Sequence, residues 1–144
     1  MFNRRARFDY RLVETYEAGL ALVGSEVKSV FLGRANLSDA YCRISGTEAF
    51  VVNLDIEPYE NAGPYQPERR RERKLLLHRK EIDVLERRSK EKGLSIIPTR
   101  LYFRNGKAKL EIALAQGKAA YDKRTQIAKD EARRELERAR SGKF

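Results

Sequence analysis

Hydrophobic and polar positions alternate most clearly over residues 107–115. The alternating aliphatic residues are Leu110, Ile112 and Leu114. This period of two predicts a strand with one buried face. Asn105-Gly106 separates it from a β-rich run over residues 94–104, and the pair predicts a two-residue hairpin because both turn positions need a positive φ. Pro98 in the first strand predicts an edge position or a β-bulge.

Several other stretches are rich in β-branched and aromatic residues, the composition that predicts strands. These stretches are residues 8–17, 38–44, 47–54 and 74–77. Ala18-Gly19 ends the first stretch, and Ser45-Gly46 joins the second and third in a predicted hairpin. With the later hairpin, these segments predict five or six antiparallel strands.

A short helix is predicted directly after Gly24, where Ser25 can act as the N-cap. Three apolar residues then share one helical face: Val27, Val30 and Phe31. Gly33 follows at the C′ position, where glycine commonly ends a helix.

A longer helix is predicted over residues 78–92, with Gly93 as its stop. Ile82 and Leu85 are expected to face inward, whereas charged residues at i,i+4 spacing occupy the outer face. The expected ion pairs are Asp83–Arg87 and Glu86–Lys90.

These elements predict a mainly β domain over residues 1–117. Helices inserted between the strands of a small antiparallel sheet fit an OB-type β-barrel with flanking helices better than a sandwich. Residues 1–7 are expected to form a flexible basic arm. Residues 118–144 offer only a thin apolar stripe, so we expect a basic tail that is disordered alone and helical when docked.

Length and composition fit one globular domain, with 144 residues of which 41% are hydrophobic. No apolar run is long enough for a transmembrane helix, and no apolar stretch follows the basic N-terminus as in a signal peptide. The single cysteine excludes an internal disulfide, and one cysteine with one histidine excludes a His/Cys zinc site. We therefore expect a cytoplasmic monomer without metal or cofactor.

The charge balance indicates a polyanionic partner. Charged residues make up 36% of the chain, against about 25% in a typical protein, and the net charge is +10. Such an excess suits nucleic acid or an anionic membrane surface. The cations gather in three clusters, which are Arg4, Arg5 and Arg7; residues 69–74; and Lys118, Lys123 and Arg124. Tyrosines lie near or between them, a combination typical of RNA binders, although each cluster alone also fits a solvated charge run.

Two single residues admit both a functional and an ordinary interpretation. Glu17 lies at a predicted strand end, where its carboxylate either accepts hydrogen bonds from RNA or is an exposed turn residue. His78 lies at a helix start, and as a catalytic base it would need a nucleophile and an orienting carboxylate that the sequence does not place. The acidic residues are too scattered for a two-metal nuclease site, so nothing in the sequence predicts an enzyme.

Seven short motifs follow one another between residues 3 and 124. They are Asn3-Arg-Arg-Ala-Arg7, Glu14-Thr-Tyr-Glu17-Ala-Gly19, Gly24-Ser-Glu26-Val-Lys28-Ser29, Gly33-Arg-Ala-Asn36, Arg73-Lys-Leu-Leu-Leu-His78-Arg-Lys-Glu81, Leu101-Tyr-Phe-Arg-Asn105-Gly and Gly117-Lys-Ala-Ala-Tyr121-Asp-Lys-Arg124. Taken together, they make the chain resemble the SmpB family, the bacterial proteins that bind transfer-messenger RNA.

The resemblance implies an OB-type barrel with a flexible C-terminal tail and a function without catalysis. Family members bind the tRNA-like domain of transfer-messenger RNA and stand in for its missing anticodon stem in the ribosomal A site. Their tail enters the empty mRNA channel of a stalled ribosome, at the small-subunit decoding centre, and folds there. The implied partners are therefore this RNA and the ribosome, and the implied process is trans-translation.

The resemblance also assigns roles to individual positions. The RNA-binding residues that it implies, together with neighbouring cations, are Asn3, Arg4, Arg5, Arg7, Tyr10, Glu17, Lys28, Arg73, Lys74, Leu76 and His78. His78 stands where relatives can carry Asn, which also donates and accepts hydrogen bonds. The implied ribosome-binding residues are Lys118, Tyr121, Asp122, Lys123, Arg124, Lys129, Arg133 and Arg134. Tyr121 stands where relatives can carry His and keeps a flat ring for stacking.

Two alternatives stay open on the residues alone. One is an RNA-processing enzyme with a diffuse acidic site, and the other is a ribosomal or single-strand-binding OB protein. Identifying the RNA that the chain carries in cells would separate these alternatives from the SmpB function.

Overall fold

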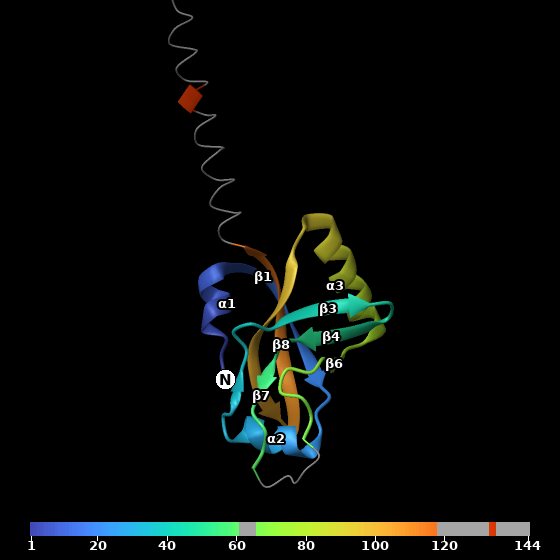
Figure 1. Ribbon diagram of the computed structural model, residues 1–144. Helices are drawn as coiled ribbons and strands as arrows, with labels where there is room; N and C mark the ends of the chain where they lie inside the picture. The colour runs from blue at the N-terminus through green and yellow to red at the C-terminus, as the bar shows by residue number, and fades with distance from the viewer. Residues whose placement is uncertain (61–65, 118–132, 135–144) are drawn as a thin grey trace, which may run out of the picture.

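The computed structural model describes residues 1–60, 66–117 and 133–134, and this part of the chain is mainly β (Figure 1). The helices are α1 (Arg4–Asp9), α2 (Gly24–Phe31) and α3 (Arg79–Lys92). The strands are β1 (Tyr10–Leu20), β2 (Ala35–Asn36), β3 (Tyr41–Ser45), β4 (Glu48–Val52), β5 (Asp55–Ile56), β6 (Arg73–Leu76), β7 (Ser95–Arg104) and β8 (Lys107–Gly117).

Six of these strands form one antiparallel sheet that closes into a barrel. Their order is β1-β6-β4-β3-β7-β8, and β8 pairs with β1 from Tyr10↔Gly117 to Gly19↔Lys109. β3 and β7 meet in the single pair Cys42↔Ile96, so this is the shortest seam of the barrel. The sequence did not predict β2 and β5, which form a separate two-stranded sheet. The three helices lie around the outside of the closed sheet in Figure 1.

Both predicted hairpins are confirmed. β3 and β4 pair through the turn after Ser45, and β7 and β8 pair through Asn105-Gly106. Asn105 has φ 53° and Gly106 has φ 73°, as a turn of this kind requires. The register between β7 and β8 shifts between Pro98 and Arg100, which is the bulge that the proline predicted.

The last strand is buried on both faces over part of its length. Leu110, Ile112 and Leu114 are fully buried in the barrel interior, as predicted. Ala113, which the alternation places on the opposite face of the strand, is also fully buried. Its neighbour Ala115 packs against Ala6 of α1 on the outside of the barrel, so the helix covers this end of the sheet.

Residues 1–7 are not a flexible arm, because α1 begins within them and Asn3 anchors its start. The Asn3 side chain accepts a hydrogen bond from the Ala6 N–H (3.1 Å), which caps the helix. Its amide nitrogen donates to the carbonyls of Leu37 (3.2 Å) and Pro98 (2.8 Å). Local patterning did not reveal this helix, because only one of its residues is buried and no apolar period marks it.

α2 ends where the sequence predicted, but its start and its buried face differ. The N-cap residue is Val23, and Ser25, the expected N-cap, lies inside the helix. Gly33 follows the helix with φ 76°, the left-handed conformation expected of a C-terminal glycine. Phe31 is exposed, whereas Glu26, Ser29 and Val30 are buried. The expectation of a purely apolar face was therefore wrong, because Glu26 points inward and forms an ion pair with Arg73, a buried residue of β6.

α3 agrees closely with its prediction. Ile82 and Leu85 are buried, and Gly93 ends the helix in the left-handed conformation. The pair Glu86–Lys90 forms at 2.8 Å. Asp83 pairs with the preceding Arg79 (3.4 Å), not with Arg87 as expected.

Candidate RNA-binding interface

A surface groove of about 590 Å³ lies where the end of β1 meets β6 and the start of α3. The antiparallel register of β1 and β6, with Gly19 opposite Leu76, brings these segments together. The lining includes cations, carboxylates and an imidazole, which come from Glu17, Glu48, Lys74, His78, Glu81 and Lys109. Four of the residues predicted to bind RNA therefore lie in one place: Glu17, Lys74, Leu76 and His78.

The alternation of β6 explains which of its side chains reach the groove. Arg73 and Leu75 point into the protein and are buried, whereas Lys74 and Leu76 point out. Leu76 is 56% exposed. An exposed leucine among charged residues provides an apolar surface on which a base or ribose can pack.

His78 is placed by the start of α3. It is the N-cap residue, with extended backbone dihedrals, and its N–H donates to the Glu81 carboxylate (3.2 Å). The side chain lies at the surface and lines the groove. An imidazole there can both donate and accept hydrogen bonds, as the predicted RNA contact requires.

Glu17 is held by two residues of β7 that the sequence analysis did not select. Its Oε2 accepts hydrogen bonds from the Tyr102 hydroxyl and from Arg104 Nη1 (2.9 Å). The Tyr102 hydrogen bond, with a lesser contribution from the Arg104 charge, holds the pKa of Glu17 below its usual value and outweighs the opposing effect of desolvation. The carboxylate is therefore charged at neutral pH.

Tyr102 has a correspondingly raised pKa, because it is partly desolvated and donates to Glu17. The Arg100 guanidinium lies over its ring, 4.1 Å from the centroid. A signal for these residues was present in the sequence. Arg100, Tyr102 and Arg104 recur at the period of two that places side chains on one face of a strand.

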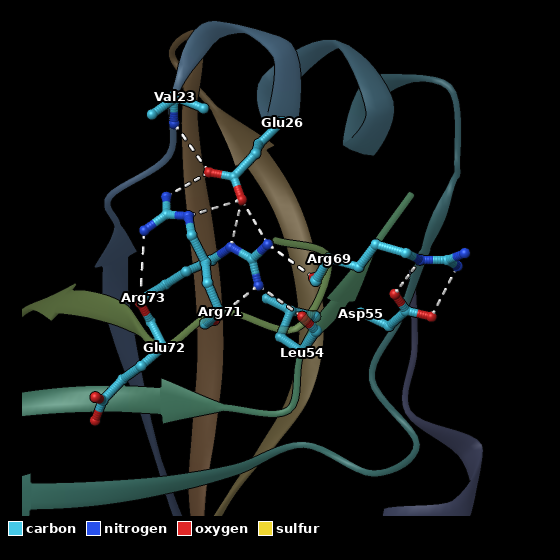
Figure 2. Close-up of polar contacts among 8 residues, drawn as sticks. All are labelled: Val23, Glu26, Leu54, Asp55, Arg69, Arg71, Glu72 and Arg73. Atoms are coloured by element: carbon cyan, nitrogen blue, oxygen red, sulfur yellow. Dashed lines mark hydrogen bonds and ion pairs between the residues drawn. The ribbon is translucent and has the colours of Figure 1, made fainter. Parts of the chain in front are cut away.

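A buried ion cluster lies on the interior side of β6 and joins it to α2 (Figure 2). Arg73 is fully buried, and its Nε donates to Glu26 (2.7 Å) while Nη1 donates to the Leu54 carbonyl (2.6 Å). Arg71 donates to the same carboxylate through Nε (3.1 Å). The expectation that Arg73 contacts RNA is therefore corrected, because its guanidinium has no exposed surface and joins β6 to α2.

The charge state of this cluster follows from its hydrogen bonds. Burial tends to raise the pKa of Glu26, but hydrogen bonds from Arg71, the Val23 N–H and Arg73 outweigh it, so the pKa is lowered. Burial lowers the pKa of Arg73, although an arginine remains charged at any physiological pH. The cluster is thus a charged carboxylate shared by two guanidinium groups.

Two arginines that precede β6, Arg69 and Arg70, are also paired with carboxylates. Arg69 makes a bidentate contact with Asp55 (3.0 and 3.1 Å). Arg70 approaches Asp39 (3.5 Å), which also accepts from Arg5 of α1 (2.9 Å). The basic segment predicted to clamp phosphates is therefore largely charge-neutralised within the protein.

The other exposed or partly exposed residues predicted to bind RNA lie away from the groove. Arg4, Arg5, Arg7 and Tyr10 belong to α1 and the start of β1. Tyr10 and Glu17 are seven residues apart on an extended strand, a distance of about 24 Å. Lys28 lies on α2, with its ammonium 5.3 Å from the Tyr59 ring centroid. The structure thus distributes the predicted RNA-binding residues over three areas.

Comparison with known proteins identifies the family. The family model described as SmpB protein matches residues 1–142. The chain belongs to the SmpB family. An SsrA-binding protein of Desulforudis audaxviator is 52% identical, covering 98% of this chain and 92% of the relative. One of Rubrobacter xylanophilus is 56% identical, covering 95% and 91%. A solved structure, described as "tmRNA-SmpB: a journey to the center of the bacterial ribosome", is 43% identical with a TM-score of 0.69, covering 81% of this chain and 82% of that chain.

Of the residues predicted to bind the ribosome, only Arg133 and Arg134 lie within the described part of this SmpB-family chain, and both are exposed. The others lie outside the described residues: Lys118, Tyr121, Asp122, Lys123, Arg124 and Lys129. The prediction of a tail that is disordered alone concerns the same undescribed region.

Two further findings concern the described residues alone. They contain no group of three or more His, Cys, Asp or Glu side chains arranged to hold a metal ion. None of their helices has the length and apolar character needed to cross a membrane.

Proposed function

We propose that this chain is an RNA-binding protein of trans-translation. It binds the tRNA-like domain of transfer-messenger RNA and delivers this RNA to stalled ribosomes. The observation that carries the proposal is the groove where Glu17, Lys74, Leu76 and His78 meet. The names of the SsrA-binding relatives and the likeness to a solved tmRNA–SmpB structure support the choice of RNA and of the ribosome.

The proposal gives each part of the chain a role. The closed sheet is an OB-type barrel, and residues 1–117 form the RNA-binding unit, since β8 ends at Gly117. Residues 118–144 probe the empty mRNA channel beside the decoding centre. The ribosome-contacting residues in this proposal are Lys118, Tyr121, Asp122, Lys123, Arg124, Lys129, Arg133 and Arg134.

The three areas of predicted RNA contacts have different chemistry. The groove supplies an apolar surface at Leu76 and hydrogen-bonding groups beside it. The α1 area supplies exposed arginines and the Tyr10 ring, while the buried Asn3 acts by fixing α1. Lys28 supplies a further cation from α2. Separate areas suit a folded RNA, whose backbone follows a curved surface, better than a short single strand.

The proposed activity is binding without catalysis by this chain, and its place is the cytoplasm, where stalled ribosomes occur. His78 serves as a hydrogen-bonding group of the RNA surface, not as a base. Its ring lies in the groove beside Leu76 and Lys74, a setting that suits recognition.

The test has two stages. The tagged full-length chain is first purified from cells with its RNA, and the RNA is sequenced. Transfer-messenger RNA is expected to be the most enriched species relative to a tag-only control. The purified chain is then titrated with the isolated tRNA-like domain and with an elongator tRNA of similar size. Equal affinity for the two would contradict the proposal.

A further inference from the structure

Glu17 presents a physical problem for its predicted role. It is a charged carboxylate on the surface of a protein whose partner is a polyanion. Two other carboxylates, Glu48 and Glu81, line the same groove. A carboxylate there opposes phosphate groups, so any favourable effect has to come from what it holds.

The structure shows what Glu17 holds. A single oxygen, Oε2, accepts hydrogen bonds from both the Tyr102 hydroxyl and Arg104 Nη1. The Glu17 side chain is 35% exposed, whereas that of Arg104 is 64% exposed. The guanidinium is therefore more accessible to a partner than the carboxylate that holds it.

Arg104 is suited to a phosphate contact because it is fixed in advance. It is the last residue of β7, next to the Asn105-Gly106 turn, where a long side chain would otherwise sample many rotamers. Immobilising such a side chain opposes binding, and a preorganised one loses less entropy. A guanidinium carries five N–H donors, so the bond to Glu17 leaves donors for a phosphate.

Glu17 is itself held in place by Tyr102. Tyr102 lies two residues before Arg104, so both side chains leave the same face of β7. The Tyr102 ring is covered by the Arg100 guanidinium at 4.1 Å. The order of contacts is therefore Arg100, Tyr102, Glu17 and Arg104, and only the last is largely exposed.

We propose that Glu17 and Tyr102 are positioning residues that aim Arg104 at a phosphate of the bound RNA. Arg104 makes the contact, and Glu17 acts through it without accepting a hydrogen bond from a base or ribose. This inference rests on the proposed function and names a phosphate-binding residue absent from the sequence-based set.

A double-mutant cycle on the full-length chain tests this arrangement. The variants are Glu17→Ala, Arg104→Gln and the double variant, each titrated with the tRNA-like domain of transfer-messenger RNA. We expect each single change to weaken binding about tenfold, the effect of one charge-assisted hydrogen bond. The double variant is expected to bind no more weakly than Arg104→Gln alone, because Glu17 has nothing left to position.

The salt dependence provides a readout that a purely structural role would not change. The slope of log affinity against log salt is expected to become shallower by about one unit in Arg104→Gln, and by a similar amount in Glu17→Ala. Tyr102→Phe, which removes only the hydroxyl, is also expected to lower the affinity for the tRNA-like domain. Lys90→Gln is the matched control, because it removes an exposed cation paired with Glu86 at the far end of α3.

The outcomes separate the inference from the proposed function. If the loss of affinity in the double variant equals the product of the two single losses, Glu17 contacts RNA directly and the inference is overturned. An unchanged salt slope in Arg104→Gln would also overturn it. If the unmodified chain does not prefer the tRNA-like domain to an elongator tRNA, the proposed function itself fails. Thermal melting of every variant identifies any that is unfolded, and Arg104→Met, which also removes the charge, then replaces Arg104→Gln in the cycle.

Discussion

Gly19 and Leu76 face each other across the β1–β6 pair so closely that a Cβ on Gly19 would lie 3.0 Å from the Leu76 Cβ. A Cβ atom is fixed by its own backbone and cannot rotate away. Only a glycine at position 19 therefore leaves room for Leu76 at its place in the groove.

Gly19→Ala is expected to destabilise the protein by about 1–3 kcal/mol, because the added methyl forces the two strands apart. It is also expected to weaken binding to the tRNA-like domain, since Leu76 and Glu17 lie beside the displaced segment. Thermal melting and titration measure the two effects. The matched control is Gly24→Ala, because a Cβ there meets nothing within 4 Å. Similar losses in both variants would show that the close approach is not the cause.

Glu26→Gln is expected to lower the free energy of unfolding by about 3–5 kcal/mol. The change leaves Arg73 buried without a balancing charge and weakens the contact with Arg71. Urea unfolding at pH 7 measures it. Glu60→Gln is the control, because Glu60 is 83% exposed and pairs with Arg34 at the surface (3.7 Å), so a change within about 0.5 kcal/mol is expected.

The same carboxylate predicts how stability depends on pH. The folded pKa of Glu26 is lowered, so its stabilising effect is complete above the unfolded value of about 4.3 and is lost as pH falls through the folded pKa. The unmodified protein should therefore lose more stability than Glu26→Gln as the pH falls from about 5 to about 3. Urea unfolding at intervals across this range tests the sign. If the free energy of unfolding falls equally with pH in both proteins, the acid-sensitive group is not Glu26.

Binding to the tRNA-like domain is expected to weaken steeply with salt. Each contacted phosphate contributes about 0.7–0.9 log units of affinity per tenfold change in salt. Lys74→Gln should reduce this slope by about one contact, because Lys74 is exposed at the groove and its pairing with Glu48 is loose (3.5 Å). Titrations at four salt concentrations determine the slope. An affinity that does not depend on salt would show that the basic residues do not contact the RNA.

A chain ending at Gly117 is expected to keep nearly all its affinity for the tRNA-like domain. β8 ends at this residue, and the barrel and its groove lie before it. The same truncated chain is expected to lose peptide tagging on stalled ribosomes, because it lacks the segment proposed to enter the mRNA channel. Both assays are run on one preparation. Full tagging would contradict the proposed role of residues 118–144, and lost RNA binding would move the boundary of the RNA-binding unit.

The sequence predicted the elements whose local signals are strong. The hairpin at Asn105-Gly106 and the stop of α3 at Gly93 were correct, because positive φ restricts which residues fit. α1 was missed because its anchor, Asn3, bonds to the carbonyls of Leu37 and Pro98, and no local pattern reports contacts of that range.

The candidate site was predictable only in part. Motifs selected Glu17, Leu76 and His78, which the structure brings together in one groove, but they also assigned a surface role to Arg73, which is buried. The alternation of a strand makes one of two neighbouring cations internal, and which one depends on the register of β6 against β4. The Glu17–Arg104 pair joins residues 87 positions apart, so it follows from the barrel closure alone.

Closure between β1 and β8 also sets when the protein can fold during its own synthesis. Tyr10 pairs with Gly117, so the first strand waits unpaired on one side until the chain has been made past residue 117. At about 5–20 residues per second this interval lasts roughly 5–20 s. An exposed strand edge is prone to wrong pairing, and the charges along β1, which include Arg11, Glu14 and Glu17, oppose it. Glu17 is therefore one of the charges that disfavour wrong pairing of this strand edge before β8 has been made.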